Sequence, residues 1–243
     1  MTHKLIHLAL PSYSGMVSAQ TMDSLVQELL LASTKGYILQ FDQLIGSSDI
    51  AAVRNAYIGR FLHNTAAERL VYIDTDLGWE PGTIVKLLDH PVDFVVGGYR
   101  VRTDPEQYRV HFQPGPIQKR NPLTGERVRS DDPKGLIEIN RAPGGLVCIT
   151  RAAAEKMTEA YASLKYSDGI SSSGYSWGLF DQIHKDGCRW SEDLAFCMRW
   201  QDIGGKVWLD PDLTIYHVGP KVFKGNLETY LRERAAKEPR VAP

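Results

Sequence analysis

The chain has 243 residues, of which 43% are hydrophobic and 23% are charged. These proportions are typical of a globular domain with a sizeable core, and they exclude a disordered or a fibrous protein. The 28 Lys and Arg residues against 29 Asp and Glu residues give a formal net charge of −1. Overall charge therefore neither requires nor excludes a polyanionic partner.

The cysteines and the apolar runs indicate the cellular compartment in which the protein is expected. Cys148, Cys188 and Cys197 are widely spaced and form no CxxC pair, so neither a disulfide framework nor a zinc knuckle is expected. The apolar stretch 5–10 is short and is followed by Pro11, which favours a first strand over a secretion signal. No run approaches the roughly 20 apolar residues of a membrane span. We expect a cytoplasmic protein without membrane contact.

Hydrophobic periodicity predicts alternating strands and helices. In chain order the expected elements are strand 4–10, helix 18–34, strand 37–44, helix 48–63, strand 69–74, helix 81–90, strand 92–98, strand 145–150, helix 151–163, helix 191–203, strand 206–210, strand 213–218 and helix 226–238. Such alternation predicts an α/β fold with a mostly parallel sheet flanked by helices, and ligands beyond the carboxyl ends of the strands.

One long segment does not fit this alternation. Residues 103–134 are polar and contain five prolines, which predicts a hairpin or flap-like excursion. No linker divides the chain, so we expect a single domain over residues 1–219 and a helical extension over residues 220–243.

The strongest local signal is the triad Asp74, Thr75 and Asp76 at the end of an apolar strand. On an extended segment residues i and i+2 point the same way, so the two carboxylates would repel unless a cation lies between them. A hard divalent ion with oxygen ligands is the usual solution. An acidic turn that caps the helix at Pro81 explains the triad equally well.

Two further groups could complete such a site. Glu192 and Asp193 follow Ser191 at a predicted helix start, where a serine cap and acids opposing the helix dipole are a sufficient structural explanation. His217 ends a strand just before Gly219, where a structural histidine is the simpler reading. Taken together, two aspartates, an acidic pair and a histidine at the ends of elements of one sheet are what a metal-assisted transfer site needs.

The motifs resemble, in order, those of a known family. The stretches that carry the resemblance are PSYSG (11–15), the Arg54-Asn55 helix, DTD (74–76) followed by GWEP, GGLVCITR (144–151), SEDLAFCMRW (191–200) and YHVG (216–219). This series resembles the nucleotide-sugar-dependent glycosyltransferases of the GT-A fold, closest to the family 2-like group, over residues 5–219. The resemblance implies a GT-A fold, which is a Rossmann-like sheet flanked by helices.

The resemblance also implies a donor site. The residues that would bind the nucleotide sugar are Pro11, Ser12, Tyr13, Arg54, Asn55, Asp74, Thr75 and Asp76. Among them Pro11, Ser12 and Tyr13 would hold the base, and the Arg-Asn pair would lie beside the nucleotide or diphosphate, where an Arg fork suits phosphate. Asp76, His217 and Asp74 would ligate Mn²⁺ or Mg²⁺, with Asp74 nearer the ribose or sugar.

On the acceptor side the resemblance implies that Asp193 is the catalytic carboxylate. In an inverting enzyme it would remove the proton of the acceptor hydroxyl, with Glu192 supporting it or touching the acceptor. In a retaining enzyme it would not be a simple base. Gly144 and Gly145 would let the acceptor approach, and Trp190 would serve as a platform, although core packing explains Trp190 as well.

The sequence indicates the acceptor only through weaker signals. A UDP-sugar is the expected donor. Segment 100–141 carries nine basic and six acidic residues, and compact enzymes of this kind resemble phage-type glycosyltransferases that modify hydroxymethylated pyrimidines in DNA. That likeness implies a double-stranded DNA partner, base flipping and, for a phage-encoded protein, the host cytoplasm. The alternative acceptor is a glycan or small molecule, and the alternative for the basic residues is a solvated surface.

Two other functions remain open. Paired aspartates at a strand end also serve metal-dependent phosphohydrolases and nucleotidyltransferases. A nucleotide-sugar binder without catalysis would share the fold. The sequence leaves the sugar, the linkage and the oligomeric state undetermined.

Overall fold

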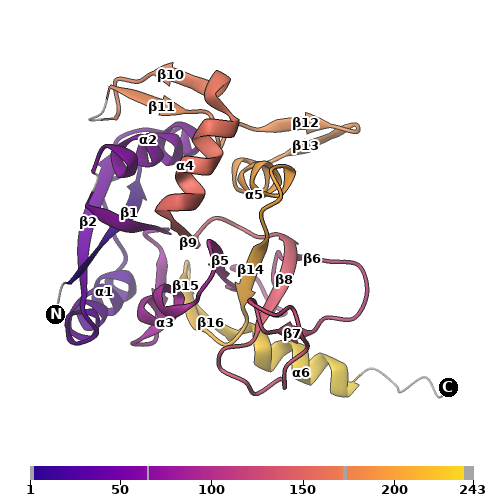
Figure 1. Ribbon diagram of the computed structural model, residues 1–243. Helices are drawn as coiled ribbons and strands as arrows, with labels where there is room; N and C mark the ends of the chain where they lie inside the picture. The colour runs from indigo at the N-terminus through magenta and orange to yellow at the C-terminus, as the bar shows by residue number, and fades with distance from the viewer. Residues whose placement is uncertain (1–2, 65, 172–173, 238–243) are drawn as a thin grey trace.

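The computed structural model describes residues 3–64, 66–171 and 174–237. A nine-stranded sheet with strand order β2-β1-β3-β9-β5-β14-β8-β6 runs through its centre, and β7 also pairs with β8 (Figure 1). The strands of this sheet are β1 (Lys4–Ser12), β2 (Tyr37–Ile45), β3 (Ala67–Ile73), β5 (Phe94–Gly97), β6 (His111–Phe112), β7 (Lys119–Arg120), β8 (Leu136–Arg141), β9 (Leu146–Thr150) and β14 (Val207–Asp210).

The direction of the strands confirms the predicted α/β fold. β1 is parallel to β2 and β3, and β14 is parallel to β5. β9 runs antiparallel between β3 and β5, and β8 runs antiparallel to β14, β6 and β7. In the described chain seven of these nine strands therefore point one way. The reversed β9 places its amino end beside the carboxyl ends of β3 and β5, and this brings residues 144–145 to the edge where Asp74 lies.

Helices cover both faces of the sheet, as predicted. They are α1 (Ala19–Thr34), α2 (Ile50–His63), α3 (Thr83–Asp89), α4 (Arg151–Ala160), α5 (Glu192–Asp202) and α6 (Leu227–Lys237). Along β3, Leu70 and Tyr72 share a buried cluster with residues of α2, α4 and α5, whereas Val71 and Ile73 share one with residues of α1 and α3. Figure 1 shows α2 and α4 on one face and α1 and α3 on the other. The apolar run of β3 is thus explained by burial on both faces.

Local capping explains where several helices begin. The side chain of Ser18 accepts a hydrogen bond from Thr21 N, and that of Asp49 accepts from Ala51 N and Ala52 N. Thr150 caps α4 in the same way through Ala153 N. These side chains satisfy backbone donors that have no partner inside the helix, and the helix starts therefore fall within a residue or two of the predicted ones.

The smaller strands were mostly not predicted. They are β4 (Leu77–Trp79), β15 (Thr214–Val218) and β16 (Val222–Asn226), which form one sheet, the hairpin of β10 (Lys165–Ser167) and β11 (Tyr175–Trp177), and the hairpin of β12 (Ile183–Lys185) and β13 (Cys188–Trp190). A 3-10 turn, Ala162–Leu164, follows α4. β16 lies inside the segment expected to be a helical extension, so the chain forms a strand there before α6 begins.

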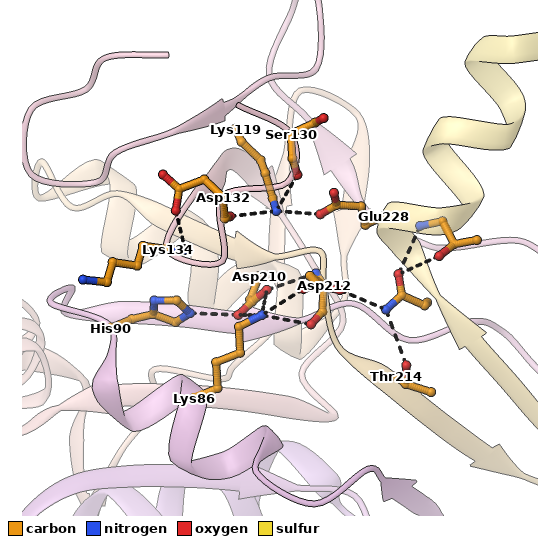
Figure 2. Close-up of polar contacts among 12 residues, drawn as sticks. Lys86, His90, Lys119, Ser130, Asp132, Lys134, Asp210, Asp212, Thr214 and Glu228 are labelled. Atoms are coloured by element: carbon orange, nitrogen blue, oxygen red, sulfur yellow. Dashed lines mark hydrogen bonds and ion pairs between the residues drawn. The ribbon is translucent and has the colours of Figure 1, made fainter. Parts of the chain in front are cut away.

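The excursion at 103–134 joins the main sheet through β6 and β7 and also contacts α6. Figure 2 shows Lys119 at this contact. Its ammonium group donates to the carbonyl oxygens of Ser130 (2.9 Å) and Asp132 (3.1 Å) and forms a 2.6 Å ion pair with Glu228 of α6. Because Lys119 is buried, this pairing fixes α6 against the excursion. No helix among the described residues is long and apolar enough to cross a membrane.

Candidate active site

Arg54 is the centre of the polar groups at the sheet edge. It lies in the second turn of α2 with its side chain 5% exposed, and its guanidinium contacts Asp74 Oδ1 at 3.0 Å and Glu192 Oε1 at 3.1 Å. A buried guanidinium is stable only with such partners. Burial disfavours its charge, but Asp74, Glu192 and Asp193 outweigh that effect and raise the pKa of Arg54. One cation therefore joins the predicted donor triad to the predicted catalytic pair.

The triad itself is a turn and not an extended segment. β3 ends at Ile73, and Leu77 N donates to Asp74 O at 3.1 Å. The expectation that both carboxylates point the same way is therefore wrong, because it assumed extended backbone through Asp76. Asp74 contacts Arg54, whereas Asp76 contacts Arg102 Nη1 through Oδ2 at 3.0 Å. Thr75 accepts hydrogen bonds at its carbonyl oxygen from Ser18 N and Thr21 Oγ1, which anchors the turn to α1.

Asp76 and His217 come together as predicted. β15 pairs with β4, and His217 Nε2 lies 3.6 Å from Asp76 Oδ2. The other ring nitrogen of His217, Nδ1, lies 2.9 Å from the carbonyl oxygen of Arg100. A carbonyl oxygen only accepts, so Nδ1 carries a proton and Nε2 is the ring nitrogen that faces Asp76. Burial raises the pKa of Asp76, but His217 and Arg102 bring it below its usual value.

This pair fits a divalent ion. Nε2 of His217, which ligates metals in its unprotonated form, faces a carboxylate oxygen, and the hydrogen bond at Nδ1 is the outer-shell contact that metal-ligating histidines usually have. The described residues contain no cluster of three or more His, Cys, Asp or Glu side chains that could hold a metal. Asp74 is instead held by Arg54. Mg²⁺ commonly binds through one or two protein carboxylates plus substrate phosphates, so a two-residue site is adequate if a diphosphate supplies further oxygens.

Gly144 and Gly145 are required by close packing in the site. A Cβ at Gly144 would lie 2.7 Å from Arg54 Nη1 and 3.1 Å from Asp193 Cβ. A Cβ at Gly145 would lie 2.5 Å from the Tyr99 hydroxyl and 2.7 Å from Asp74 Oδ2. Gly145 O also accepts from Asp74 N at 2.9 Å. The two glycines therefore let the acidic groups approach the backbone before β9.

Tyr99 is a site residue that sequence reasoning missed. Its hydroxyl accepts a hydrogen bond from Gly145 N at 3.2 Å, and its ring packs edge-on against His217 with centroids 5.2 Å apart. Burial, reinforced by Asp74, raises its pKa well above the usual value, so the hydroxyl stays protonated. The signal was available, because Tyr99 follows β5 as Asp74 follows β3, and both strands end at one edge.

Asp193 is held firmly in the first turn of α5. Its Oδ2 accepts from Gly144 N at 3.2 Å, and its Oδ1 accepts from Leu194 N at 2.8 Å and from the hydroxyl of Ser191. The simple capping explanation for this segment is therefore incomplete, because the Ser191 side chain makes no cap hydrogen bond and binds Asp193 instead. Glu192 turns to Arg54.

Trp190 is the last residue of β13, two residues before α5 begins, and one face of its ring is covered. The guanidinium carbon of Arg141 is 4.1 Å from the centroid of the indole, and His111 approaches its edge. The face of Trp190 that Arg141 covers is therefore not open to an acceptor as a platform.

Some predicted residues lie apart from this cluster. Asn55 is completely buried and binds the 180–181 segment, accepting from Phe180 N and donating to Asp181 Oδ1. Pro11 and Ser12 are buried at the end of β1, with the Ser12 hydroxyl bound to Met16 O. Tyr13 is 69% exposed just beyond this strand.

The basic residues of segment 100–141 are less free than their number suggests. Arg100 pairs with Asp104, Arg102 with Asp76, Lys119 with Glu228 and Arg129 with Asp131. Internal pairing therefore removes several of the charges on which the DNA expectation relied.

A separate cavity of about 740 Å³ lies between the excursion and α6. Its walls are mainly apolar side chains such as Phe112, Ile117 and Leu231. None of the predicted site residues lines it, so its size does not bear on the chemistry at Arg54.

Comparison with known proteins supports the fold. No protein-family model matches the chain, and no curated protein matches it in sequence. Among solved structures, A197 from STIV is similar with a TM-score of 0.53 and 16% identity over 88% of this chain and 85% of that one. This likeness shows a shared fold.

Weaker likenesses carry no argument of their own. The catalytic domain of Drosophila beta1,4-galactosyltransferase 7, in complex with xylobiose, gives a TM-score of 0.42 and 14% identity over 90% of this chain and 67% of that one. A glycosyltransferase involved in glycosylation of the PBCV-1 major capsid gives 0.32 and 13% identity over 65% and 66%.

Proposed function

We propose that this chain is a metal-dependent glycosyltransferase that moves a sugar from a nucleotide-sugar donor to an acceptor hydroxyl. The observation that carries the proposal is the contact of buried Arg54 with both Asp74 and Glu192. Through Arg54 the triad 74–76 and the acidic pair Glu192–Asp193 are joined by one cation, and Gly144 and Gly145 pack against these groups. The family resemblance implies the same two half-sites.

The donor would lie on the Asp74–Asp76 side. Asp76 and His217 would hold Mn²⁺ or Mg²⁺, and the ion would neutralise the charge of the departing diphosphate when bound. Arg102, which contacts Asp76 and is 47% exposed, can turn toward phosphate oxygens. A UDP-sugar is the donor we propose, with Tyr13 near the base.

The acceptor would lie on the Asp193 side. Three hydrogen bonds orient the Asp193 carboxylate, so it can accept the proton of an attacking hydroxyl if the reaction inverts configuration. The hydroxymethyl group of a pyrimidine in double-stranded DNA is the acceptor we propose to test first. The basic residues of segment 100–141 support it, and the ion pairs within that segment count against it.

The test follows which bond of the donor breaks. The protein is incubated with UDP-sugars and Mn²⁺ in H₂¹⁸O, first without and then with hydroxymethylcytosine DNA. Glycosyl transfer releases the nucleoside diphosphate, and slow transfer to water places ¹⁸O on the sugar. Release of a nucleoside monophosphate would instead establish a phosphohydrolase or nucleotidyltransferase. Transfer to a free glycan and none to the DNA would overturn the acceptor.

A further inference from the structure

The guanidinium of Arg141 lies at the acceptor side of the site without an anionic partner. No carboxylate of the described residues lies within 4.0 Å of it, and its buried Nε has no hydrogen-bond acceptor there. Arg54 and Arg60 also have a buried Nε without an acceptor, but their terminal nitrogens each contact a carboxylate, which those of Arg141 do not among the described residues. A buried donor without a partner destabilises the protein, so Arg141 leaves an unsatisfied hydrogen-bond donor in the site.

Neighbouring groups place the Arg141 guanidinium close to the acceptor side of the site. Arg141 ends β8, three residues before Gly144, and it is stacked on Trp190, three residues before Asp193. On β6, His111 pairs in register with Arg141. Burial and the charge of Arg141 lower the pKa of His111, whereas Asp193 raises it, so all three are within electrostatic reach.

The stack also limits what Arg141 can do. A guanidinium that lies on an indole is held in one plane, which leaves its edge to bind a ligand. The fork of N–H groups at that edge matches an oxyanion, and phosphate is the common ligand for which Arg is preferred.

We infer that Arg141, held on Trp190, binds a phosphate group of the acceptor next to the hydroxyl that Asp193 serves. The acceptor class is then a phosphate-bearing one, either a nucleic-acid phosphodiester or a sugar phosphate. This inference rests on the proposed glycosyl transfer for its role, although the oxyanion site can be tested without it.

The first test is a titration followed by NMR of the arginine Nε–H signals. The Arg141 signal is assigned by its loss in Arg141→Lys. Methyl phosphate is expected to shift it saturably, while the signal of exposed Arg129 shows no saturation and sodium chloride of equal ionic strength moves neither. No saturable shift, or an equal response to acetate and to methyl phosphate, would overturn the phosphate site.

The second test measures function in the same variant. Arg141→Lys is expected to raise the KM for a hydroxymethylcytosine oligonucleotide about tenfold. An oligonucleotide with neutral methylphosphonate linkages beside the modified base should be equally poor for both proteins. If wild type hydrolyses no nucleotide sugar, the proposed function fails, while the NMR titration still decides the phosphate site. If Arg141→Lys raises the KM for a sugar phosphate and leaves the KM for the oligonucleotide unchanged, nucleic acid is excluded as the source of the phosphate.

Discussion

The guanidinium of Arg54 lies 3.0 Å from Asp74 Oδ1, which ties the middle of α2 to the turn after β3. The same guanidinium reaches Glu192 at 3.1 Å, so three segments that are distant in sequence meet on one buried charge. Removal of this charge is therefore expected to affect the stability of the fold.

Arg54→Met is expected to lower the free energy of unfolding by about 2 to 4 kcal/mol, because it leaves Asp74 and Glu192 without their counter-ion. The lower end allows for their partial exposure to water. Urea unfolding measures the loss. Arg129→Met is the matched control, since the Arg129–Asp131 pair is exposed and should leave the unfolding midpoint unchanged. Equal behaviour of the two variants would show that Arg54 is not a structural centre.

Gly145→Ala tests the packing between β9 and the carboxylates. The new methyl group would lie 2.5 Å from the Tyr99 hydroxyl and 2.7 Å from Asp74 Oδ2, so one of these must move. We expect a loss of about 1 to 3 kcal/mol in stability and a loss of donor hydrolysis of tenfold or more. Gly169→Ala has no atom within 4 Å of its new methyl group and a backbone that L residues adopt, and it should change neither quantity.

Tyr99→Phe keeps the ring against His217 and removes the hydroxyl that accepts from Gly145 N. The Gly145 amide is then left without its acceptor, which should lower the free energy of unfolding by about 1 to 3 kcal/mol. Thermal unfolding provides the measurement, and Tyr13→Phe, which removes an exposed hydroxyl, is the stability control. An unchanged melting temperature in Tyr99→Phe would show that Gly145 N finds another partner.

Asp210 makes the stability of the fold depend on acid pH. Burial raises its pKa, but His90 at 2.8 Å and Lys86 at 3.1 Å outweigh that effect and hold the pKa below its usual value (Figure 2). A carboxyl whose pKa is depressed by folding contributes stability above its unfolded value, near 3.9, and loses it as pH falls through the folded value.

Asp210→Asn is therefore expected to be less stable than wild type at pH 7 and to lose less further stability between about pH 4 and pH 2. Urea unfolding at a series of pH values gives, for each protein, the slope of the free energy of unfolding against pH. Parallel slopes for the two proteins would show that the protonation of Asp210 is not linked to folding.

Much of the fold could be predicted from the sequence, because the long elements carry clear periodicity and caps. The strand from Arg69 and the helices behind Ser18 and Asp49 are examples, and all lie where they were expected. The reversed direction of β9 could not be predicted, because the apolar run GLVCIT fits a parallel strand and an antiparallel strand equally well. The hairpins between residues 165 and 190 are too short to show a period of two.

The site was predictable in its parts but not in its connections. Asp76 and His217 meet as expected, because β15 pairs with β4. The contact of Asp74 with Arg54 and the hydrogen bond from Gly145 N to Tyr99 depend on which elements are neighbours in the fold. No local pattern contains that information.

The most direct test of the proposed function is thermal unfolding with a panel of nucleoside diphosphates and nucleotide sugars, each with and without Mn²⁺, in wild type and Asp76→Ala. Binding of a ligand to the native state raises the free energy of unfolding by RT ln(1 + [L]/Kd), which is about 2.7 kcal/mol when the ligand concentration is a hundred times Kd. We predict a Mn²⁺-dependent rise in melting temperature with one uridine-type donor in wild type and its loss in Asp76→Ala. No shift with any nucleotide, or an equal shift in both proteins, would contradict a metal-dependent donor site at Asp76.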